Sequence, residues 1–322
     1  MSGDLILPTT ARRRRLAGVD VGTNTLRMLV AEVDDRHRLT PVAHGREMAR
    51  LGEGLVATGR MSDRAVARAL DCLAGFAKAI AGAAPEATAA VATSAVRESA
   101  NGPEFVSRVR ERTGLEVRVI DGEEEARLTA LGATGALAGP LGDLLVLDIG
   151  GGSTELALRK GGVPAAQVSI GVGVVTLTER FIRSDPPKPH ELYALDDHLR
   201  DHMRAARRAL GDVGPVRLVA TAGTPTTLAA IDQEMTSYDP ARINNHHLTL
   251  ARVEELFDRL ATMPMAQRAR VTGIERGRED LIVAGCAVLY RVMHDWQFGG
   301  VTVSDWGLRE GLVLDLFDRM GN

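Results

Sequence analysis

Short apolar runs alternate with longer stretches of helical periodicity along this chain. The clearest helical stretch covers residues 62–82, where Ser62 is placed to cap the helix N-terminus and Gly82 to end the helix. The apolar face of this helix consists of Val66, Leu70, Leu73, Ala77 and Ile80. Because strand patterns and helical patterns alternate, the sequence predicts an α/β fold.

A strand, an Asp-x-Gly turn and a second strand occur twice. The first copy, LAGVDVGTNTLRMLVAEV, contains Asp20, and the second, LLVLDIGGGSTELAL, contains Asp148. The match continues downstream, because Val91 in AVATSAV lies 71 residues after Asp20, and Val219 in LVATAGT lies 71 residues after Asp148. The sequence therefore predicts an internal repeat.

A third pair of matching segments reveals an insertion in the second copy. VRVIDGEEEARL and VTVSDWGLREGL each indicate a strand that ends in an aspartate and leads into a helix. Asp121 lies 30 residues after Val91, whereas Asp305 lies 86 residues after Val219, so the second copy carries 56 extra residues. The amphipathic segments LARVEELFDRLATM and REDLIVAGCAVLYRVM predict an added helical lobe.

Two copies of this plan predict two ribonuclease-H-like domains that face one another across an interdomain cleft. We place the N-terminal domain at residues 1–128 and the C-terminal domain, with its helical insertion, at residues 129–322. The border follows from the stretch between Leu128 and Gly142, which is rich in glycine and small side chains. The final helix, GLREGLVLDLFDRM, is a candidate to pack back on the first domain.

Composition narrows the class of protein. Of the 322 residues 45% are hydrophobic and 25% are charged, as in soluble globular proteins. A net charge of −3 argues against nucleic-acid binding, and no apolar run of about 18 residues is available to span a bilayer. The two cysteines, Cys72 and Cys286, lie in separate helical patterns, which favours a reducing compartment. We expect a cytoplasmic protein with no nucleic-acid or membrane partner.

The glycine-rich turns indicate phosphate binding. Glycine has no Cβ, so a ligand can approach the main chain, where consecutive amide N–H groups form an anion site. One Asp-x-Gly turn is common, but two copies with equal spacing favour two phosphate loops that face each other. The lysine-bearing P-loop pattern is absent from the sequence. The candidate phosphate-binding residues are Gly22, Thr23, Asn24, Thr25, Thr93, Ser94, Gly150, Gly151, Gly152, Ser153, Thr154, Gly223 and Thr224.

Asp20 and Asp148 each precede one of these turns. Their carboxylates would repel a phosphate unless a cation lies between them. Mg²⁺ prefers oxygen ligands and commonly bridges carboxylates to phosphates. We therefore expect Mg²⁺ as a cofactor, with Asp20 and Asp148 as ligands.

Hydrolysis of a phosphoanhydride needs a base for the attacking water and positive charge on the phosphoryl group. One candidate base lies in the acidic run Glu123–Glu125, and the other is Glu155, which could instead bind the metal. Acidic residues in a first helical turn also stabilise the helix dipole, so the residues alone leave this choice open. Arg97, at the end of VATSAVRE, is the candidate catalytic cation because a guanidinium can clamp a phosphate.

With these motifs assembled, the chain resembles the exopolyphosphatase and guanosine pentaphosphate phosphohydrolase family, in the sugar kinase, heat-shock chaperone and actin superfamily. The segments that follow the family's order are VDVGTNTLRMLV, VATSAVRES, VIDGEEEARL, LDIGGGSTEL, ATAGT and VSDWGLREG. The resemblance implies a Mg²⁺-dependent enzyme that removes terminal phosphate from inorganic polyphosphate or from guanosine pentaphosphate. It also implies that Glu125 is the base and that Glu155 is a second essential acid, with Asp148 its companion on the ion.

The resemblance further implies a short, two-domain form, because longer members continue beyond this last motif into a helical domain. A homodimer is compatible with it. Two other functions stay open: an ATP-dependent kinase or ATPase on the same fold, and a non-catalytic sensor of polyphosphate or of an alarmone. The intact Glu125 and Glu155 argue against the sensor.

Overall fold

The first of two β-sheets is built from the N-terminal part of the chain. The protein is described by a computed structural model that covers residues 13–321. Strands β1 (Arg13–Val21), β2 (Leu26–Asp34) and β3 (Leu39–Glu47) are antiparallel neighbours. On the other side of β1, strands β4 (Ala87–Ala92) and β5 (Val117–Val119) continue the sheet in parallel, which gives the order β3-β2-β1-β4-β5.

The second sheet repeats this arrangement. Strands β6 (Leu144–Ile149), β7 (Thr154–Lys160) and β8 (Val163–Ile170) are antiparallel neighbours, and β9 (Arg217–Thr221) and β11 (Gly300–Val303) lie parallel beyond β6. A short strand, β10 (His247–Thr249), adds an antiparallel edge, so the order is β10-β11-β9-β6-β7-β8. The predicted α/β fold with two repeated domains is confirmed.

The register of the two copies differs slightly from the sequence alignment. Asp20 pairs with Val91, as the repeat suggests, but Asp148 pairs with Thr221. Thr221, and not Val219, is therefore the counterpart of Val91 in the sheet. The repeated Ala-Thr motifs have the same residue types in both copies, but they occupy different positions relative to Asp20 and Asp148 in the two sheets.

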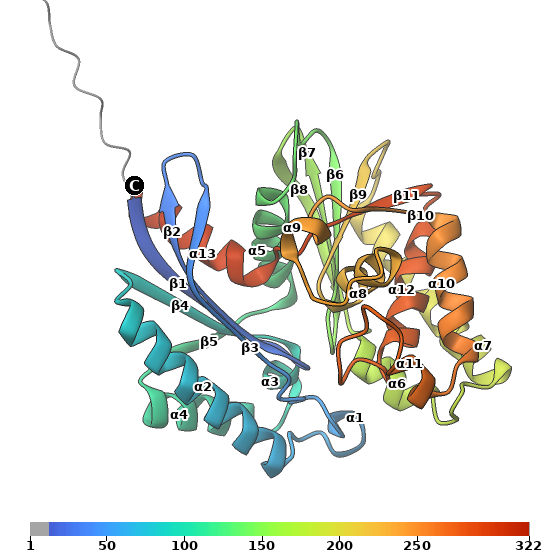
Figure 1. Cartoon of the computed structure of the whole chain (residues 1–322), viewed down its shortest axis with the longest axis horizontal. Coiled ribbons are helices and arrows are strands. Elements are labelled where there is room, and N and C mark those ends of the chain that lie inside the picture. The colour runs from blue at the N-terminus through green and yellow to red at the C-terminus, as the bar shows by residue number, and fades with distance from the viewer. Residues whose placement is uncertain (1–12, 322) are drawn as a thin grey trace, which may run out of the picture.

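Helices cover both faces of each sheet (Figure 1). On the first sheet α2 and α4 pack on one face and α13 on the other; on the second, α5 packs on one face and α7, α8 and α12 on the other. The helices are α1 (Leu55–Thr58), α2 (Asp63–Ala83), α3 (Ser94–Glu98), α4 (Gly102–Thr113), α5 (Gly122–Gly135), α6 (Val174–Phe181), α7 (Pro189–Leu210), α8 (Gly223–Asp232), α9 (Pro240–Ile243), α10 (Leu250–Thr262), α11 (Met265–Arg268), α12 (Ile282–Asp295) and α13 (Leu308–Gly321).

The helix that the sequence marks most clearly is α2. The Ser62 hydroxyl accepts a hydrogen bond from the Ala65 N–H at 3.2 Å, as its predicted capping role requires. Gly82 does not end the helix, which continues to Ala83. Ala84 then adopts the left-handed conformation, with φ 48°.

Helices α5 and α13 connect the two halves of the molecule. α5 follows the first sheet in sequence but packs against β7 and β8, whereas α13 follows the second sheet and packs against β1 and β2. They cross where glycines let their backbones approach, because a Cβ added at Gly132 would lie 2.6 Å from the amide nitrogen of Gly311. Residue 128, the expected domain border, lies inside the continuous α5. The division of the chain at that residue stays a prediction.

The 56-residue insertion holds more than helices. It contributes the edge strand β10 as well as α10 and α12. The buried side chains of α10 and α12 belong to the same hydrophobic core as those of α7 and α8. The insertion therefore extends the core of the second domain and is not a separate lobe.

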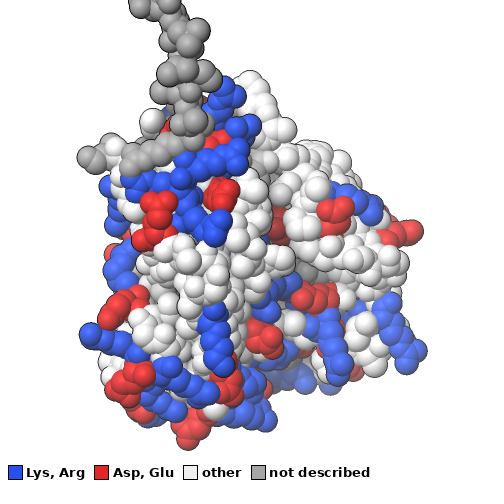
Figure 2. Space-filling model, turned by 60° about the vertical axis from the view of Figure 1, so that its left-hand side comes forward, with Lys and Arg blue, Asp and Glu red and all other residues white. Residues whose placement is uncertain are grey.

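Charged side chains of both signs are interspersed on the face shown in Figure 2, in keeping with the net charge of −3. Among residues 13–321, no helix combines the length and the hydrophobicity that crossing a bilayer requires.

Candidate active site

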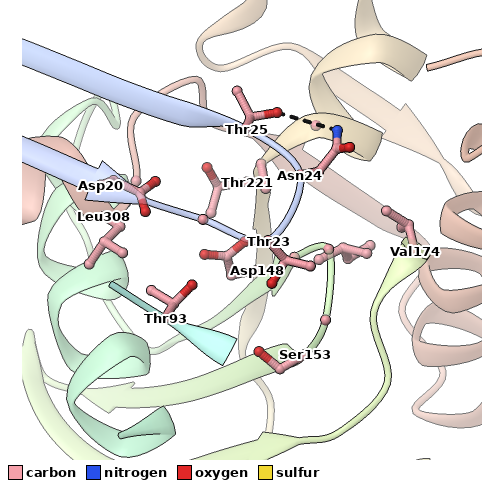
Figure 3. A pocket seen from close by; sticks show the side chains of 18 of the residues that line it. Asp20, Thr23, Asn24, Thr25, Thr93, Asp148, Ser153, Val174, Thr221 and Leu308 are labelled. Carbon is pink, nitrogen blue, oxygen red and sulfur yellow. Dashed lines mark hydrogen bonds between the residues drawn. The ribbon is translucent and has the colours of Figure 1, made fainter. Parts of the chain in front are cut away.

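A cavity of about 90 Å³ lies where strand ends of the two sheets meet (Figure 3). The turns after β1 and β6 form opposite walls, and residues at the ends of β4 and β9 complete it. Its lining includes eleven of the thirteen predicted phosphate-binding residues: Gly22, Thr23, Asn24, Thr25, Thr93, Gly150, Gly151, Gly152, Ser153, Gly223 and Thr224.

The two glycine turns have the same local geometry. A Cβ added at Gly22 would lie 2.8 Å from the Thr25 carbonyl oxygen, and a Cβ added at Gly150 would lie 2.8 Å from the Ser153 carbonyl oxygen. In the second turn the Gly150 N–H also donates a hydrogen bond of 3.0 Å to that Ser153 oxygen. Glycine is required at both positions because a side chain would collide with the main chain of its own turn.

The two turns also touch each other across the cavity. A Cβ added at Gly151 would lie 2.8 Å from the Thr23 Cβ and 3.1 Å from the Asn24 amide nitrogen. The Thr23 hydroxyl accepts a hydrogen bond of 3.1 Å from the Ala95 N–H, which fixes the first turn to the start of α3. A ligand in the cavity therefore contacts residues of both sheets at once.

Ser94 and Thr154 do not line the cavity. The Ser94 hydroxyl donates to Glu98 at 2.9 Å, and the fully buried Thr154 hydroxyl donates to the Val172 carbonyl oxygen at 2.6 Å. Both hydroxyls are thus engaged within the protein. Their role as phosphate ligands stays a prediction.

Arg97 also lies outside the cavity lining. Its Nη1 atom donates to the Ile120 carbonyl oxygen at 2.9 Å and lies 3.4 Å from Oε2 of Glu125. The guanidinium is thus bonded to the helix end that carries Glu125. In this structure Arg97 contacts the Glu125 carboxylate, and its role as a direct phosphate clamp stays a prediction.

Glu125 lines the cavity from the first turn of α5 and is 7% exposed. The two residues before it, Glu123 and Glu124, are not part of the lining. Glu124 instead makes ion pairs with Arg127 and Arg118 at 3.1 Å. The helical geometry therefore singles out one glutamate of the acidic run.

Glu155 is buried directly behind the cavity. It pairs with Asp148 in the β6–β7 register, and its Oε1 atom accepts a hydrogen bond of 2.7 Å from the Ser169 hydroxyl. Asp148 and Asp20 themselves line the cavity. The four predicted carboxylates are thus brought together, three in the wall and one behind it.

Burial and mutual repulsion raise the pKa values of these acids. Burial raises the pKa of Asp20 to about 7, against the opposing charge of Arg27. Burial and the charge of Asp148 raise the pKa of Glu155 to about 8. The pKa of Glu125 is raised by burial and then by the negative charges of the other three acids. Such a cluster favours the binding of a cation.

The residues present fit Mg²⁺ in a limited way. Among residues 13–321, no group of three or more His, Cys, Asp or Glu side chains is arranged to hold a metal ion. Mg²⁺, however, usually keeps several waters and takes only one or two carboxylates together with substrate phosphates. Asp20 and Asp148, which are both buried and both line the cavity, meet that requirement.

Two arginines that the sequence analysis did not select also line the cavity, Arg27 and Arg278. Arg27 pairs with Asp20 in the β1–β2 register, as Glu155 pairs with Asp148 in the second copy. The repeat therefore contained the signal for Arg27. Arg278 lies in the insertion, which has no counterpart in the first copy, and only the fold brings it to the site.

The start of α8 forms another part of the wall. Ala222 has φ 71° and ψ −161°, a conformation that strongly favours glycine. Within the described residues no side-chain cap hydrogen bond is made at the N-terminus of this helix, and its first residues, Gly223 and Thr224, line the cavity. A helix N-terminus of this kind binds anions.

Two facing glycine turns, a buried carboxylate cluster and cavity arginines define a site for transfer of a phosphoryl group to water. Residues 29–320 match the Ppx/GppA phosphatase family. The chain belongs to this family and is a phosphoanhydride hydrolase.

Similar proteins support this assignment. The chain is 35% identical over 318 residues to exopolyphosphatase 2 of Mycobacterium tuberculosis, with 94% of this chain and 98% of that protein covered. The Ppx/GppA family member of Aquifex aeolicus is similar in structure, with a TM-score of 0.83, 30% identity and coverage of 97% and 100% of the two chains. An exopolyphosphatase of Cytophaga hutchinsonii has a TM-score of 0.87, 26% identity and coverage of 95% and 98%.

Proposed function

We propose that the protein is an exopolyphosphatase, which hydrolyses the terminal phosphoanhydride of inorganic polyphosphate and releases orthophosphate. The observation that carries the proposal is the pair of identical glycine turns that meet around one carboxylate-lined cavity. A cavity of about 90 Å³ equals the liquid volume of about three waters, at about 30 Å³ each, which suits a single terminal phosphoryl group. Polyphosphate presents such a terminal group and carries no nucleoside.

Glu125 is the base in this proposal. It lines the cavity, and Arg97 holds its Oε2 atom from behind at 3.4 Å. The water oxygen forms a bond to the terminal phosphorus, the bridging P–O bond breaks, and the proton of the water passes to the Glu125 carboxylate. The remaining chain leaves shorter by one phosphate.

Positive charge for the phosphoryl oxygens comes from the arginines and from main-chain N–H groups. Arg27 and Arg278 line the same cavity as the glycine turns. The N-terminus of α8, which has no side-chain cap among the described residues, borders the cavity on the side of β9 and would add main-chain N–H donors there. These donors are fixed by the fold before substrate arrives, which is the condition under which they stabilise developing charge most effectively.

Asp20 and Asp148 would hold Mg²⁺ at this site. When bound, the ion supplies charge neutralisation between the carboxylates and the phosphate oxygens. Glu125, whose pKa is raised by burial and by the neighbouring acids, must be ionised to accept the proton, and Arg97 opposes that rise.

The test is phosphate release from long polyphosphate, tripolyphosphate, guanosine pentaphosphate and ATP, compared side by side at equal concentration. Each substrate is assayed with Mg²⁺ and with excess chelator. We expect polyphosphate to be the best substrate and the chelator to abolish turnover, with recovery on addition of Mg²⁺. Guanosine pentaphosphate as the best substrate would move the assignment to the second activity of the family resemblance, and ATP as the best substrate would favour an ATPase.

A further inference from the structure

A second, larger cavity of about 330 Å³ adjoins the first, and Arg27 and Arg278 line both. Arg46 on β3 and Arg309 on α13 also belong to its lining. Four guanidinium groups around one space repel each other and attract anions. Burial, together with the charges of Arg46 and Arg27, lowers the pKa of Arg278 to about 10.

Two acids of the lining oppose this positive charge, Asp305 and Glu275. Asp305 is bonded to the Tyr238 hydroxyl and lies 3.6 Å from Arg309, whose Nε atom also pairs with Oε1 of Glu310 at 2.5 Å, so the charge of Arg309 is neutralised on that side of the cavity. Glu275 lies between the other arginines. Its Oε2 atom is 2.5 Å from Nη2 of Arg46 and 3.2 Å from Nε of Arg278.

Glu275, Arg46 and Arg278 differ in how far their side chains are exposed to solvent. The side chain of Glu275 is 45% exposed, whereas those of Arg46 and Arg278 are 28% and 11% exposed. Glu275 can therefore swing into solvent with little loss of packing, while the arginines remain in place. Its single oxygen bridges a strand of the first sheet and the insertion of the second, which is the position that a phosphate oxygen would take between the same two guanidinium groups.

We infer that Glu275 is a built-in counter-anion that incoming substrate displaces, and that it sets the affinity of the cavity for polyanions. The inference rests on the proposed function, since it assigns the inner phosphates of the substrate to this second cavity. Orthophosphate, held only at the first cavity, does not displace Glu275. A chain of several phosphates does, because its inner oxygens replace both arginine contacts when its end occupies the first cavity. Glu275 thereby weakens the binding of the polymer, which favours release of the shortened chain, and leaves the binding of orthophosphate unchanged.

The experiment is calorimetric titration with inorganic tripolyphosphate and Mg²⁺ in a Glu125→Gln background, in which the cation is present and loss of the proposed base suppresses turnover. Glu275→Gln removes the negative charge and keeps the size of the side chain. Glu86→Gln is the matched control, because Glu86 also pairs with one arginine, Arg14 at 3.4 Å, and is 47% exposed, but lies outside both cavities. Both variants change the net charge by the same amount.

We expect Glu275→Gln to lower the Kd for tripolyphosphate by about 3- to 30-fold, the range for loss of a competing charge-assisted contact, and Glu86→Gln to change it less than about twofold. An unchanged or raised Kd for Glu275→Gln would overturn the inference, since it would mean that the carboxylate only positions the arginines. Thermal unfolding of each variant verifies that it is folded.

A double-mutant cycle gives a second test. In the Arg46→Gln background, Glu275→Gln should improve binding less than in the wild type, because one of the two freed cations is gone. An equal improvement in both backgrounds would contradict displacement from Arg46. The proposed function fails separately: a wild type that binds tripolyphosphate but releases no phosphate with Mg²⁺ would refute the hydrolase assignment and leave the binding result intact.

Discussion

Gly151→Ala perturbs the contact between the two glycine turns, on which the site depends. The added Cβ would lie 2.8 Å from the Thr23 Cβ and 3.1 Å from the Asn24 amide nitrogen. Carbon atoms in contact prefer a separation of about 3.5–4.0 Å, so the turns must move apart by about 1 Å. Neither neighbouring atom is the end of a flexible side chain, so the main chain must take up the shift.

A misplacement of about 1 Å in a catalytic site lowers the rate by about 10²-fold, or about 3 kcal/mol in the barrier. We therefore expect kcat/KM for phosphate release from polyphosphate to fall by about two orders of magnitude. The free energy of unfolding, measured in urea, should fall by about 1–3 kcal/mol, as for overpacking in a core.

The matched control is Gly75→Ala in the exposed part of α2, where an added Cβ meets nothing within 4 Å. It should keep full activity and gain about 0.5–1 kcal/mol, because alanine is the better helix former. Wild-type activity in Gly151→Ala, within about twofold, would refute the idea that both turns act on one phosphoryl group.

Two further predictions concern stability. Ala222→Gly should raise the free energy of unfolding by about 1 kcal/mol, because φ 71° is strained for alanine and free for glycine; a loss of stability in urea titration would contradict that strain. Glu191→Gln tests acid lability, since the carboxylate accepts backbone hydrogen bonds from Lys188, Arg183 and Ser184 that hold its pKa below 4.5. A carboxylate whose pKa is lower in the folded state stabilises the protein at pH values above its pKa in the unfolded state. This stabilisation is lost as the pH falls through its pKa in the folded state. The variant should therefore be less stable than wild type at pH 7 and lose less stability between pH 5 and pH 3; an equal acid loss would oppose this reasoning.

The internal repeat made most of the fold predictable. Asp20 and Asp148, each at the end of a strand and before a glycine turn, identified the central strand of each sheet and the two loops that meet. The exchange of α5 and α13 between the sheets was only partly predictable, because an amphipathic pattern shows that a helix packs but not on which sheet. The role of Gly132 and Gly311 at their crossing appears only in three dimensions.

Some residues of the site could likewise be selected from the sequence, and others could not. Glycines and hydroxyl residues of the turns are local features, so most of them could be selected from the sequence. Thr154 could not be separated from Ser153, because only the strand register shows that one hydroxyl bonds to Val172 while the other faces the cavity. Arg278 was missed because it reaches the site from an insertion without a repeated counterpart.

The most direct test of the account compares Glu125→Gln with Glu124→Gln in phosphate release from polyphosphate with Mg²⁺. The two glutamates are neighbours on the first turn of α5, but only Glu125 lines the cavity. We predict that kcat falls by about 10²-fold or more for Glu125→Gln, as for loss of a general base, and stays within a few-fold of wild type for Glu124→Gln. Equal activity of Glu125→Gln and wild type would contradict the assignment of the base and with it the central claim about this site.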